Sequence, residues 1–335
     1  MPSDLRSALL DATVVQLVPL CREHFRLTLD APGLPESSAG QFVQVLCRET
    51  TDALFGGATA SDTELDWTPG SPLELTNPDL VERHALLRRP FSIAGRKGDR
   101  LELILRTVGP GTEYLSQLKP GEIVSLIGPL GNRFTPPPSK GVAFFVGGGV
   151  GIPPMIYLAQ VLQEANMGNP GQKSVAFCGA TTRELLALTV TNNAPAPSGT
   201  SIEPLYNIAE FDQFGVPAVI TTDDGTYGFK GFVTDALVGY LDRWITDNAD
   251  RARAVIYTCG PEGMMKRVQE IARVRSIACQ IAVERAMACG MGTCQSCCVR
   301  IKKPDPARPP LAGKEWCYKL ACTDGPVFTG DELLW

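Results

Sequence analysis

Apolar residues in the first 138 positions form short runs with strand character. Alternating or continuous segments such as TVVQLV, QFVQVLC, LELILR and EIVSLIG are separated by Gly and Pro turns. Runs of this length, bounded by turn residues, predict strands. Several short strands at close spacing are typical of a small barrel. We therefore expect residues 1–138 to form an antiparallel β-barrel domain.

The pattern changes near residue 139, where strand-like runs begin to alternate with helix-like segments. GVAFFVG precedes PPMIYLAQVLQEA, and AVIYTCG precedes PEGMMKRVQEIARV. This alternation predicts a parallel sheet covered by helices, so we assign residues 139–276 to an α/β nucleotide-binding domain. Residues 277–335 are short of apolar mass, rich in Cys and Gly, and contain no convincing helix. We expect them to form a third, small domain held together by a metal centre.

Composition argues against nucleic-acid-binding and membrane-spanning proteins and leaves the three predicted domains unchanged. Charged residues make up 20% of the chain and the net charge is −5, so there is no basic surface that would predict nucleic-acid binding. No apolar stretch approaches the roughly 20 residues that span a bilayer. We therefore expect a soluble cytoplasmic protein with no membrane contact. The two histidines, His24 and His84, are expected to be surface or packing residues.

Eleven cysteines stand out against this ordinary composition, and four of them fall in the stretch ERAMACGMGTCQSCCVRIKK. Cytoplasmic thiols stay reduced, so clustered cysteines point to a metal or to catalysis rather than to disulfides. The spacing Cys289-x4-Cys294-x2-Cys297 is the plant-type spacing for a [2Fe–2S] cluster. Zinc sites more often pair two C-x2-C steps, and only one is clear here. The spacing favours iron–sulfur over zinc or free thiols.

The fourth ligand is open on spacing alone, because Cys317 and Cys322 both occur in EWCYKLACTDGPVF. Cys298 directly follows Cys297 and would point to the opposite face of a strand, so we expect it to be a bystander. Four further cysteines stand singly in apolar runs, and we expect them to be small buried residues. They are Cys21, Cys47, Cys178 and Cys279.

Two upstream motifs suit a flavin that would supply electrons to such a cluster. LLRRPFSIAG places Arg89 and Ser92 at a strand start, and RTVGPGTEYL places Gly111 and Thr112 ahead of a helix. Arginine and backbone amides at a Gly-rich helix start suit a pyrophosphate, and a strand hydroxyl can meet a flavin ring. Taken singly, an Arg pair is usually a solvated face and G-x-G is usually a turn.

A third motif lies where nucleotides bind open α/β sheets, after a strand and before a helix. FFVGGGVGIPPMIYL contains Gly148, Gly149 and Gly151, and it is not the G-x-G-x-x-G fingerprint of common dehydrogenases. At the end of a later strand, YTCGPEGMM would bring Cys259, Gly260 and Pro261 to the same rim, where a nicotinamide could approach a flavin. The alternative is a buried cysteine before a helix start.

The order R-P-F-S, G-x-G-T, GGGVGIPP, CGP and C-terminal cysteine loop resembles the ferredoxin–NADP reductase superfamily. LRRPFSI, GPLGNRF, TTDDGTYGFKGFVTD, ERAMACGMGTCQSC and ACTDGPVF resemble, more narrowly, the electron transfer subunits of dihydroorotate dehydrogenase B. The resemblance covers about residues 11–330. It implies that the fourth cluster ligand is Cys322 rather than Cys317, beside Cys289, Cys294 and Cys297. The FAD contacts that it implies are Arg89, Pro90, Phe91, Ser92, Leu105, Arg106, Gly111 and Thr112.

The resemblance also implies a function. Hydride would pass between NAD(H) and FAD, and single electrons between the cluster and the FMN of a separate catalytic subunit that oxidises dihydroorotate to orotate in pyrimidine biosynthesis. The implied assembly is a heterotetramer with two copies of each subunit. A flavin is needed because nicotinamide moves electrons in pairs and the cluster accepts one. The chain contains no evident site for orotate, so that chemistry is expected to need the partner.

Two alternatives remain open at this point. A related reductase subunit, such as an NADPH–ferredoxin transhydrogenase or an oxygenase reductase, would share every cofactor motif. A non-catalytic module with structural zinc would share the cysteines alone. Asp223 and Asp224, near a strand end, are expected to repel a 2′-phosphate and so favour NAD over NADP. Glu284 either approaches the flavin or is an ordinary exposed carboxylate.

Two segments are longer than the resemblance predicts. Residues 51–80 precede the R-P-F-S motif and are expected to be disordered or a binding flap. VRIKKPDPARPPLAGKEWCYK lengthens the gap before Cys322. Both segments lie where a partner or a neighbouring domain would dock.

Overall fold

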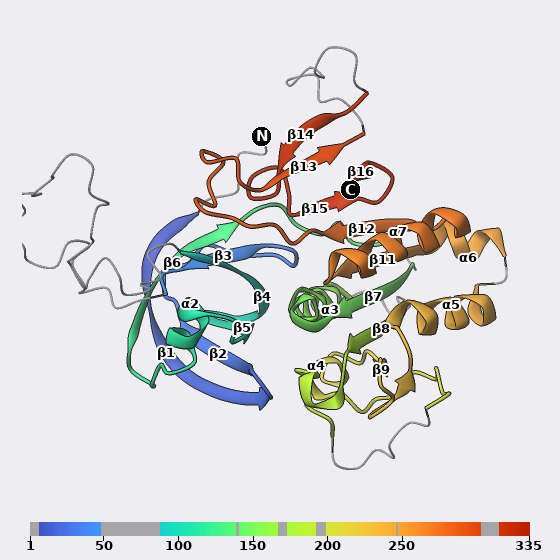
Figure 1. Ribbon diagram of the computed structural model, residues 1–335, viewed down its shortest axis with the longest axis horizontal. Helices are drawn as coiled ribbons and strands as arrows, with labels where there is room; N and C mark the ends of the chain where they lie inside the picture. Colours follow the sequence, from blue (N-terminus) through green and yellow to red (C-terminus); the bar gives the residue numbers. More distant parts are fainter. Residues whose placement is uncertain are drawn as a thin grey trace, which may run out of the picture.

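The computed structural model describes residues 7–47, 88–138, 141–166, 173–191, 199–245, 247–302 and 315–335 (Figure 1). The segment 51–80, His84 and most of the insert before Cys317 lie outside the described residues, so the expectations for them are not addressed. Among the described helices, none combines the length and the apolar character needed to cross a membrane.

The N-terminal strands close into a barrel, which confirms the predicted antiparallel β-barrel. The order around it is β1-β2-β5-β4-β3-β6, and every neighbouring pair is antiparallel. Its strands are β1 (Ala8–Cys21), β2 (His24–Asp30), β3 (Phe42–Val45), β4 (Arg89–Lys97), β5 (Arg100–Arg106) and β6 (Ile123–Leu130). The short helix α2 (Pro110–Leu115) lies between β5 and β6 in the chain. Fully buried Leu27, Leu101 and Leu103 alternate with more exposed neighbours, as strands with one face in a core require.

The second sheet has seven strands in the order β10-β9-β8-β7-β11-β12-β15. All neighbours are parallel except β12 and β15, which confirms the predicted parallel core. Its strands are β7 (Val142–Gly148), β8 (Lys173–Ala180), β9 (Ala218–Thr222), β10 (Phe229–Lys230), β11 (Ala254–Cys259), β12 (Ala278–Ala282) and β15 (Val327–Thr329). Strands β12 and β15 come from the segment expected to form the third domain, so the cysteine-rich region is continuous with this sheet.

Helices cover both faces of the sheet. They are α3 (Pro153–Asn166), α4 (Ala209–Asp212), α5 (Val233–Trp244), α6 (Asn248–Arg253) and α7 (Glu262–Arg275), with short 3-10 turns η1 (Gly149–Gly151) and η2 (Arg183–Leu185). Side chains alternate along β7: Phe144 joins the core under α5 and α7, and Phe145 joins the core shared with the barrel. Helix α3 packs against β4, where the Gln160 amide bonds both backbone groups of Arg96. The barrel and the sheet therefore share one continuous core.

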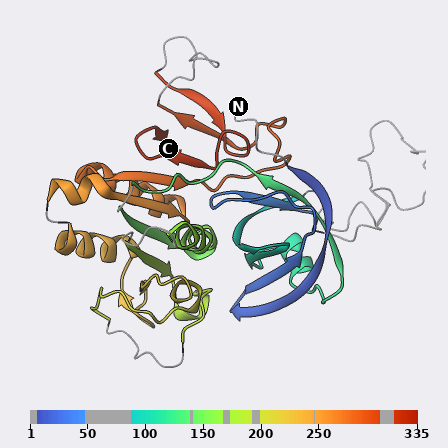
Figure 2. The same cartoon turned by 180° about the vertical axis from the view of Figure 1, so that it is seen from behind.

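A small sheet completes the fold in the order β14-β13-β16, with β13 (Cys298–Ile301), β14 (Cys317–Leu320) and β16 (Leu333–Leu334). It lies above both the barrel and the edge of the large sheet in the two opposite views (Figures 1 and 2). Its core contains Val299, Leu333 and also Phe42 from β3 of the barrel. The small domain is therefore anchored on both larger ones.

Candidate functional site

A pocket of about 650 Å³ opens at the carboxyl ends of the parallel strands, against one end of the barrel. Ligands bind at this edge in open α/β sheets. Six residues singled out in the sequence line it: Arg106, Gly148, Gly149, Asp223, Pro261 and Glu284. They come from β5 of the barrel, from the turns after β7, β9 and β11, and from the segment that follows β12. The topology thus joins the flavin motif, the glycine motif and the approach to the cysteine loop in one cavity.

Three predicted nucleotide residues, Gly151, Cys259 and Gly260, do not line the pocket but adjoin lining residues in the chain. A Cβ on Gly151 would stand 2.3 Å from the carbonyl carbon of Cys259 and 2.4 Å from the Gly260 nitrogen. Only a glycine allows η1 and the end of β11 to approach so closely. The Cys259 side chain is buried in the shared core, and burial raises the pKa of its thiol to about 12. Their contact with a nucleotide stays a prediction.

His24 lines the pocket, although it was expected to be a surface or packing residue. It stands opposite Arg106 in the pairing of β2 with β5 and is buried. Its Nδ1 donates to the carbonyl oxygen of Arg22 at 2.8 Å, and burial lowers the pKa of the imidazole. His24 is therefore neutral near pH 7. Its sequence neighbours are unremarkable, and the signal is the cross-strand register, which the sequence does not show.

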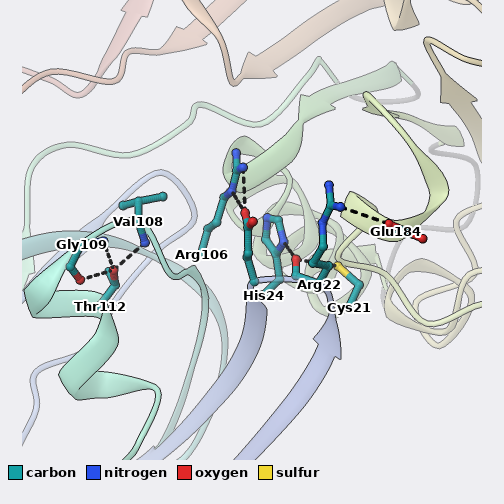
Figure 3. Close-up of polar contacts among 9 residues, drawn as sticks. Cys21, Arg22, His24, Arg106, Val108, Gly109, Thr112 and Glu184 are labelled. Carbon is teal, nitrogen blue, oxygen red and sulfur yellow. Dashed lines mark hydrogen bonds and ion pairs between the residues drawn. The ribbon is translucent and has the colours of Figure 1, made fainter.

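The hairpin around His24 also joins the barrel to the second domain (Figure 3). Arg22 forms an ion pair with Glu184 at 3.2 Å, and the Arg22 backbone N–H donates to the Glu184 carbonyl at 3.0 Å. Arg106 pairs with Glu23 at 2.9 Å. These contacts fix the side of the pocket that the barrel supplies.

The other residues of the implied FAD site lie around the same end of the barrel without lining the pocket. Arg89, Pro90, Phe91 and Ser92 form the start of β4 and are half-buried. Leu105 is buried in the barrel core. The Thr112 hydroxyl accepts from the backbone N–H groups of Val108 and Gly109, at 2.8 and 3.2 Å, and donates to the Gly109 carbonyl (Figure 3). Thr112 therefore holds the turn before α2 in shape, and Gly111 beside it is buried.

The cysteine loop brings four thiols together in two pairs. Cys289 is close enough to Cys294 to lower the pKa of its thiol, and Cys297 is close enough to Cys322 to raise the pKa of its thiol. Backbone N–H groups of Met291 and Cys294 point at the Cys289 sulfur, each at 3.4 Å. Within the described residues, no three His, Cys, Asp or Glu side chains surround one point that would hold a single metal ion. Two thiolates for each of two irons is the donor set of a [2Fe–2S] cluster, so these residues fit that group.

The environment of the two pairs differs. Hydrogen bonds from Ser296, followed by Cys289, lower the pKa of the exposed Cys294 to about 6. Burial, followed by the neighbouring Cys297, raises the pKa of Cys322 to about 12. Cys294 is therefore largely thiolate at neutral pH, which is the form that binds iron. Cys322 would lose its proton when a metal binds.

The structure separates the two candidates for the fourth ligand. Ala321 N–H donates to the Cys297 carbonyl at 3.0 Å, which places Cys322 beside the loop. Cys317 pairs with Ile301 at the far end of β13, four residues after Cys297 in the chain, or about 13 Å at strand spacing. The geometry supports Cys322. Cys298 is half-buried and begins β13 directly after Cys297, which is compatible with the predicted bystander role.

Asn132 is a second residue whose role the sequence does not show. Its side-chain amide donates to the carbonyls of Asp324 and Val327, and its oxygen accepts from the Val327 N–H. It thereby joins the motif GPLGNRF, at the end of β6, to the motif ACTDGPVF that carries Cys322. The barrel thus holds the segment that carries Cys322 in place.

Comparisons with known proteins agree with this geometry. Residues 284–334 match a family model described as the iron-sulfur cluster binding domain of dihydroorotate dehydrogenase B, and residues 145–270 match an oxidoreductase NAD-binding domain. A dihydroorotate dehydrogenase B (NAD(+)) electron transfer subunit of Desulforamulus reducens is 30% identical over 98% of this chain and 99% of its own length. The chain belongs to this family.

Other members of the electron transfer subunit family cover less of the chain. The Caldanaerobacter subterraneus subunit is 32% identical over 74% of this chain and 81% of its own length. Among solved structures, an NADH-dependent reduced ferredoxin–NADP oxidoreductase is 25% identical, with a TM-score of 0.67 over 97% of this chain and 90% of its own. The Amycolatopsis cytochrome P450 reductase GcoB is 22% identical, with a TM-score of 0.53 over 81% of this chain and 67% of its own, and shows the shared fold.

Membership of this family makes the chain an oxidoreductase subunit with an iron–sulfur domain and an NAD-binding domain. FAD accompanies the reductase fold, and the barrel end at β4 and β5 is where this chain would hold it. The structural-zinc module is therefore set aside. The residues assigned to each cofactor remain predictions that the geometry supports to different degrees, most strongly at the four cysteines.

Proposed function

We propose that this chain is the electron transfer subunit of an NAD-dependent dihydroorotate dehydrogenase. In this proposal it moves electrons between NAD(H) and the FMN of a separate catalytic subunit, by way of its own FAD and [2Fe–2S] cluster. Relatives with this name support the proposal, and one of them matches over 98% of this chain and 99% of its own length. We further propose the heterotetramer with two copies of each subunit that the family resemblance implies.

The observation that carries this function is the short path between the pocket and the cysteine loop. Glu284 lines the pocket, and Cys289 follows it by five residues. Five residues reach at most about 17 Å when fully extended, so the backbone at Glu284, on the edge of the pocket, lies within that distance of the backbone at Cys289. FAD bound between a nucleotide in the pocket and a cluster in the loop would accept electrons as a pair and release them singly, which matches the nicotinamide to the cluster.

The chain's own residues would bind the nucleotide, the flavin and the cluster and orient them relative to one another. The turns after β7 and β11 would receive the nucleotide, β4 and Arg106 would hold the flavin, and Cys289, Cys294, Cys297 and Cys322 would hold the cluster. The neutral His24 closes the barrel side of the pocket. No acid–base residue is assigned, because hydride transfer at a flavin does not require one. All eleven cysteines lie within the described residues and none forms a disulfide, which supports a reducing, cytoplasmic location.

Reconstitution tests this function. The isolated chain is expected to reduce a dye with NADH and to leave dihydroorotate untouched. Adding an FMN-containing subunit that oxidises dihydroorotate should produce dihydroorotate-dependent reduction of NAD⁺, and the mass of the complex should correspond to two copies of each chain. Dihydroorotate oxidation by the isolated chain would contradict the proposal.

The related solved structure, an NADH-dependent reduced ferredoxin–NADP oxidoreductase, gives the alternative partner a specific test. Reduced ferredoxin is supplied to the isolated chain with NADP⁺ or NAD⁺. Rapid ferredoxin-dependent reduction of NADP⁺, with no response to a dihydroorotate-oxidising subunit, would favour the transhydrogenase function. We expect no such reduction.

A further inference from the structure

The side chain of Gln44 in β3 is buried without a hydrogen-bond partner. It is 1% exposed, and within the described residues neither its Nε2 nor its Oε1 has a partner. Gln41, three residues earlier and equally buried, uses both atoms: Nε2 donates to the Gly131 carbonyl at 2.9 Å, and Oε1 accepts from the Ser38 N–H at 2.8 Å. Buried polar groups almost always have partners. We therefore expect the Gln44 amide to have a hydrogen-bond partner that is not among the described residues.

The position of Gln44 indicates which partner this is. Side chains alternate along β3, so Val43 and Val45 join the barrel core while Phe42 and Gln44 share the other face. Phe42 packs into the core of the cysteine-rich domain. Gln44 lies opposite Pro90 of the R-P-F-S motif, whose ring has no polar atom to offer. The amide therefore stands between the flavin strand and the cluster domain.

The contact with the cysteine loop is close. A Cβ on Gly290 would stand 2.5 Å from Nε2 of Gln44 and 2.7 Å from its Cδ, and Gly290 directly follows Cys289. Gly290 also has a φ of +72°, a conformation that L side chains rarely adopt. The loop is thus shaped to bring the Gln44 amide next to the Cys289 side of the cluster.

We propose that Gln44 donates a hydrogen bond from Nε2 to a sulfur of the [2Fe–2S] cluster, on the Cys289 side, and thereby raises the cluster's reduction potential. The inference rests on the proposed function for the presence of the cluster. Cluster sulfurs only accept hydrogen bonds, so the amide must present its NH2 group. Reduction adds negative charge to the cluster, and a donor stabilises that charge, as hydrogen bonds to cluster sulfurs do in general. Gln44 is then a positioning and tuning residue on the path between flavin and cluster.

The test is a redox titration of the anaerobically purified chain, with the cluster followed by electron paramagnetic resonance and the flavin by absorbance. Gln44→Met keeps the length of the side chain and removes both polar atoms. We expect a tenfold fall in the equilibrium constant for cluster reduction, which is 59 mV for one electron, with the flavin potential unchanged. Gln44→Glu, which places an acceptor at the same position, should shift the cluster potential in the same direction.

Gln41→Met is the matched control, because it removes a buried glutamine whose partners lie within the protein. It should lower the melting temperature and leave the cluster potential unchanged, the opposite pattern to Gln44→Met. The proposal is overturned if both Gln44 variants keep the wild-type cluster potential, or if only the flavin potential moves. A wild-type chain without iron or flavin would instead count against the proposed function, so the two failures are distinguishable.

Discussion

The cluster loop and the nucleotide pocket differ in how their residues are brought together. Three of the four predicted cluster cysteines are Cys289, Cys294 and Cys297, and their spacing alone predicts a [2Fe–2S] site. The pocket takes residues from His24 in the barrel to Glu284 before the loop, and no spacing in the chain connects them. A site on one loop depends on local sequence, whereas a site at a sheet edge depends on the register and order of strands.

The largest effect on iron binding is expected at the predicted fourth ligand, Cys322, which is far from the other three cysteines in the sequence. Cys322→Ser should reduce the bound iron from about two per chain to nearly none and remove the visible absorbance of the cluster, because one iron loses a thiolate. Cys317→Ser should keep the iron, since Cys317 pairs with Ile301, which follows Cys297 by four residues or about 13 Å at strand spacing. Iron analysis of both purified variants provides the measurement. Loss of iron in Cys317→Ser with retention in Cys322→Ser would reverse the ligand assignment.

The next largest effect is expected on the rate of NADH-dependent dye reduction, where η1 and the end of β11 approach each other closely beside the pocket. Gly151→Ala places a Cβ 2.3 Å from the Cys259 carbonyl carbon, so η1 must move away from β11. Displacement by about 1 Å can cost a hundredfold in rate, and we expect a loss of that order in NADH-dependent dye reduction, with iron content retained. Gly199→Ala is the control, because the nearest atom to its added Cβ is 4.0 Å away. Wild-type rates in Gly151→Ala would show that the close approach of η1 to β11 does not position the nucleotide.

Asn132 tests how far the cluster depends on the barrel. Asn132→Ala removes three hydrogen bonds to the segment after Cys322, and the expected loss is about 2 to 4 kcal/mol of unfolding free energy. Faster loss of iron to a chelator should accompany it. Denaturant unfolding compares this variant with Asn248→Ala, because the Asn248 side chain accepts a hydrogen bond from the exposed Arg251. Equal stability of the two variants would mean that the cluster domain holds its fourth ligand unaided.

The smallest expected effect concerns nucleotide choice. Asp223 lines the pocket, whereas Asp224 lies outside its lining and accepts from the backbone N–H and hydroxyl of Thr226 at 3.0 and 2.7 Å. Asp223→Asn should therefore raise kcat/KM for NADPH about tenfold, equivalent to ~1.4 kcal/mol, and Asp224→Asn should change it little. Steady-state kinetics with both nucleotides provides the measurement. Equal efficiency of the wild-type chain with NADH and NADPH would contradict this role of Asp223.

The Asp223 carboxylate should also make the discrimination against NADPH depend on pH. Burial, followed by the charge of Asp224, raises the pKa of Asp223 above its ordinary value. Its negative charge is complete well above that pKa and is lost as the pH falls through it. Discrimination against NADPH should therefore weaken on acidification in the wild type and be independent of pH over the same range in Asp223→Asn.

The sequence predicted the fold closely because each domain has a local signature. Strand-like runs with period two predicted the barrel, and alternation of strands and helices predicted the parallel sheet. The structure contains both. What it did not show depends on contacts between distant segments. His24 is paired with Arg106 only through the register of β2 with β5, and Asn132 meets Val327 across 195 residues of chain. The strands β12 and β15, which join the cysteine-rich region to the large sheet, are equally invisible to local patterns.

Addition of NADH to the anaerobically purified chain tests the central claim most directly, with iron and released flavin quantified in the same sample. The account predicts FAD and about two irons per chain, with the absorbance of both flavin and cluster bleached by NADH in the absence of any partner. A flavoprotein without iron, or a cluster that stays oxidised while the flavin is reduced, would contradict the electron path from the pocket to the cysteine loop.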